Sequence, residues 1–108
     1  MPPWAVVLKE SVIDDLRALG RREGRAVLKA AVAHLAADPL AETRHMKTLR
    51  ANPVAQRELR LFGRYRVLFS VQQVERQVSI VLVGEKRGES LLVQRRRFTA
   101  HHESYPTD

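Results

Sequence analysis

Apolar residues recur with one period in the first half of this chain and with another in the second half. After a short apolar run at residues 4–9 (WAVVLK), they return every three or four positions as far as residue 38, the period of an amphipathic helix. From Gln56 onward they alternate with polar residues, the period of a strand with one buried face. The pattern predicts one strand, a helical segment and then several strands.

The helical segment is predicted to form two helices in a hairpin. Ser11 is a suitable N-cap for the first helix, and Gly20 is well placed to end it. The second helix is expected to begin near residue 21 or 25 and to run to Asp38, because the following proline cannot continue it. Its buried stripe is predicted to be Val27, Leu28, Ala31, Val32 and Leu35.

The second half predicts three or four antiparallel strands. Residues 78–83 are apolar on both faces, which is typical of a central strand. Residues 38–52 show no clear period and are predicted to form a loop that carries basic side chains toward the sheet. The side chains expected to face the core are Leu59, Leu61, Tyr65, Val67, Phe69, Val71, Val78, Ile80, Leu82, Leu91 and Val93.

This order of elements predicts an α+β fold. An N-terminal strand and a helical hairpin are expected to pack on one face of a small, mainly antiparallel sheet of four or five strands, and the other face is expected to stay open. The length of 108 residues suits one domain. We assign this domain to residues 1–97, followed by a polar C-terminal tail at residues 98–108.

Composition and charge narrow the function classes. The chain has no cysteine, which excludes disulfides and thiolate nucleophiles, and no apolar run reaches the about 18 residues of a membrane span. We therefore expect a cytoplasmic protein with no membrane partner. The net charge is +7, and 15 arginines against 4 lysines favour recognition of phosphate, since a guanidinium can donate two hydrogen bonds to one anion. A merely solubilising basic surface, or the composition of a GC-rich genome, is the alternative explanation.

One pair of arginines stands out from the rest. If Leu61 and Tyr65 both face the core, the turn between their strands has three residues, and Arg60 then lies opposite Arg66 on the outer face. Like charges in that position destabilise a sheet, so an anion between them is expected to relieve the repulsion. The alternative is that strand arginines only cover the sheet with their aliphatic stems. Further cations that are expected to converge on this face are Arg57, Arg64, Lys86, Arg87, Arg95, Arg96 and Arg97.

Residues 58–71 (ELRLFGRYRVLFSV), followed by 78–93 (VSIVLVGEKRGESLLV) and preceded by 46–50 (MKTLR), resemble the RelE/ParE superfamily of bacterial type II toxin-antitoxin toxins. The piece "LR…YRVLF" is the most specific part of this resemblance, which spans nearly the whole chain. RelE-like members are mRNA endonucleases that cut codons in the ribosomal A site, whereas ParE-like members inhibit DNA gyrase without cleaving anything. The resemblance also implies an acidic antitoxin as partner.

The resemblance assigns roles to individual residues of this chain. Arg66 matches the arginine of the "YR" motif that holds the scissile phosphate, and Arg60 and either Lys86 or Arg87 match further basic positions. Lys47 and Arg50 resemble the basic loop before the hairpin. Some RelE nucleases carry a tyrosine just beyond the last basic site, where this chain has residues 90–92 (SLL). This difference keeps open a third possibility, a family member that only binds a partner.

Cleavage through the 2′-hydroxyl of RNA needs a base, cations on the phosphate and an acid for the leaving oxygen. Arginine supplies only the cations, because it stays protonated at neutral pH. We therefore expect Arg60 and Arg66 to act on the phosphate together with Arg50, Arg57, Arg64 and Arg87. Candidates for the base are Lys86 and Lys47, since neighbouring positive charges favour the neutral amine, and the tail residues His101 and His102. We expect no metal and no cofactor, because adjacent histidines in a strand point apart.

Overall fold

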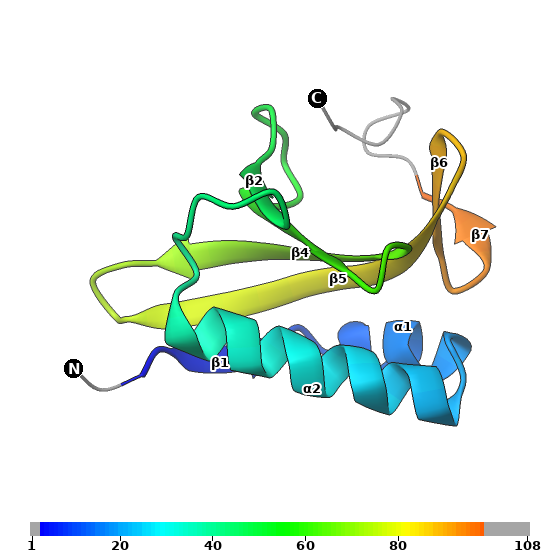
Figure 1. Ribbon diagram of the computed structural model, residues 1–108, viewed down its shortest axis with the longest axis horizontal. Helices are drawn as coiled ribbons and strands as arrows, with labels where there is room; N and C mark the ends of the chain where they lie inside the picture. Colours follow the sequence, from blue (N-terminus) through cyan, green and yellow to red (C-terminus); the bar gives the residue numbers. More distant parts are fainter. Residues whose placement is uncertain (1–2, 99–108) are drawn as a thin grey trace.

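The structure is a computed structural model, and it describes residues 3–98 of the chain. The described part contains two helices and seven strands (Figure 1). In chain order these elements are β1 (Ala5–Leu8), α1 (Val12–Ala18), α2 (Arg21–Ala37), β2 (Met46–Thr48), β3 (Arg57–Leu61), β4 (Tyr65–Gln72), β5 (Gln77–Arg87), β6 (Ser90–Val93) and β7 (Arg96–Arg97).

All seven strands belong to one sheet with the order β2-β3-β4-β5-β6-β7, in which each neighbouring pair is antiparallel. The N-terminal strand β1 lies parallel to the first part of β5. The predicted α+β architecture is confirmed, and the sheet has more strands than the expected four or five. The additional strands are short: β2 lies in the segment predicted as a loop, and β7 has only two residues. Elements this short carry too few residues for a period to be recognised.

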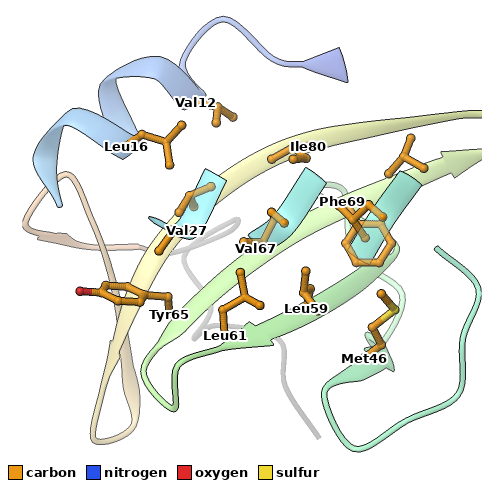
Figure 2. Close-up of a cluster of buried hydrophobic side chains, with 14 of the residues drawn as sticks. Val12, Leu16, Val27, Met46, Leu59, Leu61, Tyr65, Val67, Phe69 and Ile80 are labelled. Carbon is orange, nitrogen blue, oxygen red and sulfur yellow. The ribbon is translucent and has the colours of Figure 1, made fainter. Parts of the chain in front are cut away.

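The main core lies between the helices and one face of the sheet. Figure 1 shows α1 and α2 together on one side of β4 and β5. Val12, Val27 and Leu35 of the helices are fully buried there, and Figure 2 shows Val12 and Val27 in one apolar cluster with the strand residues Val67 and Ile80. The strand residues predicted to face the core between positions 59 and 71 are all buried. In the helix stripe, Val32 is exposed instead, because its position turns away from the sheet.

The face of the sheet opposite the helices is not uniformly open, which corrects the expectation from the sequence. A register shift next to Leu68 leaves one extra residue in β5, so that Leu68 pairs with Leu82 while Phe69 pairs with Ile80. Leu82 therefore turns away from the helices, although the alternation had placed it with Val78 and Ile80. It packs in a second apolar cluster, which contains Leu49, Ala55, Leu68, Leu82 and Leu91, with Phe98 partly buried against it.

Two glycines determine the geometry of the helical hairpin. Gly20 has a φ of 98°, a left-handed conformation that suits glycine, and it separates α1 from α2. A Cβ atom at Gly24 would lie 2.6 Å from the backbone oxygen of Leu16, so only glycine allows the two helices to pack at this distance. Ser11 precedes α1 as predicted, but its side chain makes no capping hydrogen bond.

The buried carboxylate of Asp15 ties α1 to the sheet. Its Oδ2 accepts the backbone N–H of Val83 at 3.0 Å, and its Oδ1 accepts the side-chain amide of Gln94 at 2.8 Å. The N–H of Val83 needs this acceptor because β1 ends at Leu8, whose partner in β5 is Ile80. A side chain of α1 thus joins β5 to the turn between β6 and β7. No helix among residues 3–98 is long and apolar enough to cross a membrane.

Candidate functional site

The hairpin of β3 and β4 has the register expected from the sequence. Leu61 pairs with Tyr65, and Arg60 lies directly opposite Arg66. The alternation of each strand also directs Lys47 of β2 and Lys86 of β5 to the side of the sheet away from the helices, since Lys47 pairs with Glu58 and Lys86 with Leu91. We refer to Lys47, Arg60, Arg66 and Lys86 as the arginine face.

A buried glutamate lies at the centre of the arginine face. Glu58 is two residues from Arg60 on the same strand and has no exposed surface. Its Oε1 accepts the Nε–H of Arg60 at 2.8 Å and lies 3.8 Å from Nε of Arg66. Glu58 therefore supplies the anion that the facing arginines were expected to need. This role of Glu58 was not predicted from the sequence, although Glu58 and Arg60 have the i and i+2 spacing that places two strand residues on one face.

The second oxygen of Glu58, Oε2, is buried and accepts no hydrogen bond from any described residue. A buried carboxylate oxygen without a hydrogen bond lowers the stability of the folded state, so Glu58 is locally destabilising at this atom. Two guanidinium groups share one carboxylate in this arrangement. The three groups together keep one positive charge, which attracts an anion from solution.

Arg66 is held more tightly than Arg60. Its side chain is 11% exposed, compared with 34% for Arg60. Its Nη1 donates to the backbone oxygens of Tyr65 at 3.1 Å and Gly63 at 3.4 Å. Burial lowers the pKa of Arg66 below its ordinary value; the charge of Arg60 acts in the same direction, whereas Glu58 opposes it. Arg66 remains protonated near neutral pH, so it can stabilise charge but cannot accept a proton.

The strand beside Arg66 contributes backbone instead of a side chain. Gly84 of β5 is the partner of Arg66 in the register. A Cβ atom on Gly84 would lie 2.6 Å from the backbone oxygen of Leu92 and 3.1 Å from side-chain atoms of Leu91 and Val93. The glycine thus lets β6 approach β5 closely next to the arginine face.

Arg57 lies on the other side of the sheet from the arginine face. It is buried, and it donates to the backbone oxygens of Pro39 at 2.7 Å and Ala41 at 2.9 Å. Its Nη2 also lies 3.5 Å from the carboxylate of Glu42. These contacts hold the connection between α2 and β2 against the sheet. The structure therefore separates Arg57 from Arg60 and Arg66, with which the sequence analysis had grouped it.

Arg64 and Arg87 also lie apart from the arginine face, at the end of the sheet nearest the start of α2. Arg64 donates to the hydroxyl oxygen of Tyr65 at 2.7 Å, and this hydrogen bond raises its pKa above the ordinary value. Both arginines contact Glu85, at 3.7 Å for Arg64 and 3.4 Å for Arg87. The cations that were expected to converge on one surface are therefore divided between two.

The remaining predicted residues are distributed as follows. Arg50 is exposed in the loop after β2, whereas Arg95, Arg96 and Arg97 lie in the turn between β6 and β7 and in β7 itself. His101 and His102 lie outside the described residues.

The comparisons with known proteins agree with this architecture. The chain is similar to a chain in the crystal structure of the toxin-antitoxin complex RelBE2 from Mycobacterium tuberculosis, with 29% sequence identity and a TM-score of 0.68. The match covers 80% of this chain and 94% of that one. No protein-family model matches the chain, and no curated protein matches it.

The structural match covers most of both chains. The sequence resemblance and the shared fold lead to the same assignment. The shared fold and the sequence motifs therefore support the assignment of this chain as a RelE-type toxin of a toxin-antitoxin system.

Proposed function

We propose that this RelE-type protein is a ribosome-dependent mRNA endonuclease that cleaves the phosphate backbone without a metal ion. The observation that carries the proposal is the pair of Arg60 and Arg66, which stand opposite each other on neighbouring strands around one buried carboxylate. Two guanidinium groups in this position suit a phosphate whose negative charge increases during the reaction.

The proposed reaction is an internal transfer of the RNA phosphate. A base removes the proton of the 2′-hydroxyl, the 2′-oxygen attacks phosphorus, and the bond from phosphorus to the 5′-oxygen breaks while an acid protonates that oxygen. The products are a 2′,3′-cyclic phosphate and a 5′-hydroxyl. Arg60 and Arg66 bind the phosphate and stabilise its charge, while Arg50 binds the neighbouring backbone.

The base and the acid are proposed among the groups with exchangeable protons near this face. Lys47 and Lys86 are the candidates from the sheet, because the register places both on the side of the sheet that carries Arg60 and Arg66. His101 or His102 of the tail is the alternative donor or acceptor. Glu58 is completely buried, so it is a positioning residue that holds the two arginines by Nε and does not reach a substrate hydroxyl.

An acidic antitoxin is the proposed partner. The chain has a net charge of +7, which favours association with an acidic protein. The similar structure from M. tuberculosis is a complex of a toxin with its antitoxin, and this supports the same kind of partner here.

The test is expression of the chain in growing cells, followed by mapping of RNA ends. We expect cleavage at codons of translated messages and arrested growth, both of which Arg66→Ala abolishes. Arg17→Ala is the matched control, because Arg17 is an exposed arginine on α1, on the other side of the sheet from the arginine face, and it forms an ion pair with the exposed Asp14. Growth arrest with intact messages would refute the nuclease.

A non-catalytic toxin is the second candidate, and one observation favours it. Leu91, in the segment where some RelE nucleases have a tyrosine, is fully buried in the second apolar cluster and offers no polar group to a substrate. A gyrase inhibitor of the ParE kind would then arrest growth through inhibited supercoiling and DNA damage. An assay of supercoiling with purified gyrase separates this outcome from cleavage of RNA.

A further inference from the structure

A groove lies on the helix side of the sheet, next to the tip of the β3–β4 hairpin. The arginine face lies on the opposite side of the sheet. The larger part of the groove is a cleft of about 560 Å³ between the end of α1, the first turn of α2 and the turn after β6. A second cleft adjoins it and shares the lining residues Glu23, Arg64 and Tyr65. We call the two together the hairpin groove.

The hairpin groove carries more positive than negative charge. Four arginines line it, namely Arg22, Arg64, Arg87 and Arg95, against the two glutamates Glu23 and Glu85. Glu85 contacts both Arg64 and Arg87, at 3.7 and 3.4 Å. The excess of cations favours an anionic ligand, and the planar guanidinium groups suit phosphate.

An exposed aromatic ring stands at the rim of the hairpin groove. Phe62 is 63% exposed at the tip of the hairpin. Its ring meets that of Tyr65 edge to face, with 6.5 Å between centroids. The guanidinium of Arg64 lies 4.9 Å from the centroid of the Tyr65 ring. One large apolar surface is thus left in water among charged groups, where a flat ligand ring can stack on it.

Backbone strain is concentrated around the same groove. Among the described residues, four that are not glycine have a positive φ, and three of them line the hairpin groove: Phe62 at 53°, Gln94 at 53° and Arg95 at 68°. This conformation disfavours a side chain, and it is least suited to a bulky one such as phenylalanine. Strain that folding alone does not require is typical of ligand-binding sites.

We propose that the hairpin groove binds the nucleotides of single-stranded RNA that flank the phosphate held on the arginine face, with Phe62 stacking on a base. Arg64 and Arg87 bind the phosphates of this segment. The inference rests on the proposed nuclease function for the identity of the RNA. Arg64 lies in the turn before β4, two residues from Arg66, which is at most about 7 Å along the chain, so one RNA chain can pass around the hairpin tip from one surface to the other.

A protein segment is the competing occupant. The walls around Phe62 are largely charged, and the pairing of an exposed ring with arginines is what single-stranded nucleic acid binding requires. An apolar peptide would need a deeper apolar floor than the ring of Phe62 provides. We therefore commit to RNA, and binding of an acidic peptide is one outcome of the test below.

The experiment measures binding of a labelled, single-stranded 2′-O-methyl RNA to the full chain by fluorescence anisotropy. This RNA has no free 2′-hydroxyl, so binding is measured without cleavage. Phe62→Asn removes the ring and keeps a residue that tolerates the left-handed conformation. We expect roughly tenfold weaker binding, the size of one lost stacking contact. Val74→Asn is the matched control, because Val74 is 94% exposed at the β4–β5 turn, and it should leave affinity unchanged.

A second variant tests the charge of the hairpin groove. Arg87→Gln should weaken binding and reduce the dependence of log affinity on log salt by about 0.7, the contribution of one phosphate contact on a single strand. Unchanged affinity in both Phe62→Asn and Arg87→Gln, with intact thermal unfolding, would overturn the proposal. So would unchanged RNA binding combined with lost binding of an acidic peptide.

The outcomes separate this site from the nuclease. If Phe62→Asn weakens RNA binding while the parent chain cuts no message in cells, RNA binding in the hairpin groove is supported and the proposed nuclease activity is refuted. If the parent chain cuts messages, and Phe62→Asn and Arg87→Gln bind RNA with the affinity of the parent chain, the nuclease activity is supported and RNA binding in the hairpin groove is refuted.

Discussion

Glu58 determines the balance between stability and anion affinity on the arginine face. Its carboxylate lies within ion-pair distance of both Arg60 and Arg66. Burying it costs free energy that the two arginines offset only in part, since Oε2 stays without a hydrogen bond. Removing this charge therefore acts on two properties in opposite directions.

Glu58→Gln should lower the free energy of unfolding by about 1–3 kcal/mol, because Arg60 and Arg66 then repel each other without a counter-charge. The same variant should be stabilised more strongly by sulfate than the parent chain, since an added anion replaces the missing carboxylate. Urea unfolding with and without sulfate measures both effects.

The control for this variant is Glu42→Gln. The Glu42 carboxylate is exposed and lies 3.5 Å from the buried Arg57, so solvent screens its charge and the loss of this ion pair should cost at most about 1 kcal/mol. An equal sulfate response of Glu58→Gln and the parent chain would show that Glu58 does not compete with anions for the arginines.

Among the elements, α1 and β5 are joined by a buried polar side chain in addition to their apolar contacts. Asp15 accepts hydrogen bonds from the Val83 backbone and the Gln94 amide, and it is buried. Through Gln94 it also holds the turn that supplies Arg95 to the hairpin groove. The placement of that turn is thus coupled to the first helix.

Asp15→Ala should lower the free energy of unfolding by about 1–3 kcal/mol, because a buried N–H and an amide lose their acceptor. The neighbouring Asp14→Ala is the control: Asp14 is exposed and pairs only weakly with Arg17 at 3.6 Å, so the change should stay within about 0.5 kcal/mol. Chemical denaturation of both variants tests the contrast, and equal losses would contradict the role of Asp15.

The register of the β3–β4 hairpin could be predicted from the sequence. Apolar residues alternate on both sides of residues 62–64, and both apolar sets can face the core only if the turn has an odd number of residues, so that Leu61 pairs with Tyr65. The extra residue in β5 could not be predicted, since residues 78–83 are apolar on both faces and any register buries them. The role of Glu58 escaped notice because a glutamate in a strand ordinarily faces water, and only the tertiary structure covers it.

At the scale of the whole molecule, positive charge is distributed over both sides of the sheet. The arginine face lies on one side, and the hairpin groove, with Arg64 and Arg87, lies on the other. A partner that neutralises the chain must therefore reach around the edge of the sheet or leave one surface uncovered.

The affinity for an acidic antitoxin should fall as salt concentration rises, because screening weakens attraction between exposed charges. Titration calorimetry with the proposed acidic antitoxin at two salt concentrations tests this. Arg66→Gln and Arg87→Gln, one from each surface, show which side the partner covers. Affinity that does not change with salt would indicate an interface dominated by apolar contacts.

The parallel pairing of β1 with β5 has a consequence for synthesis on the ribosome. Ala5 is made before its partner Gln77, which follows only after both helices and three further strands. Contacts so distant in sequence close late, since the intervening loop must lose its freedom first. A nascent chain can therefore form the local β3–β4 hairpin, with Arg60 opposite Arg66, before β5, the strand that pairs with β1, has left the ribosome.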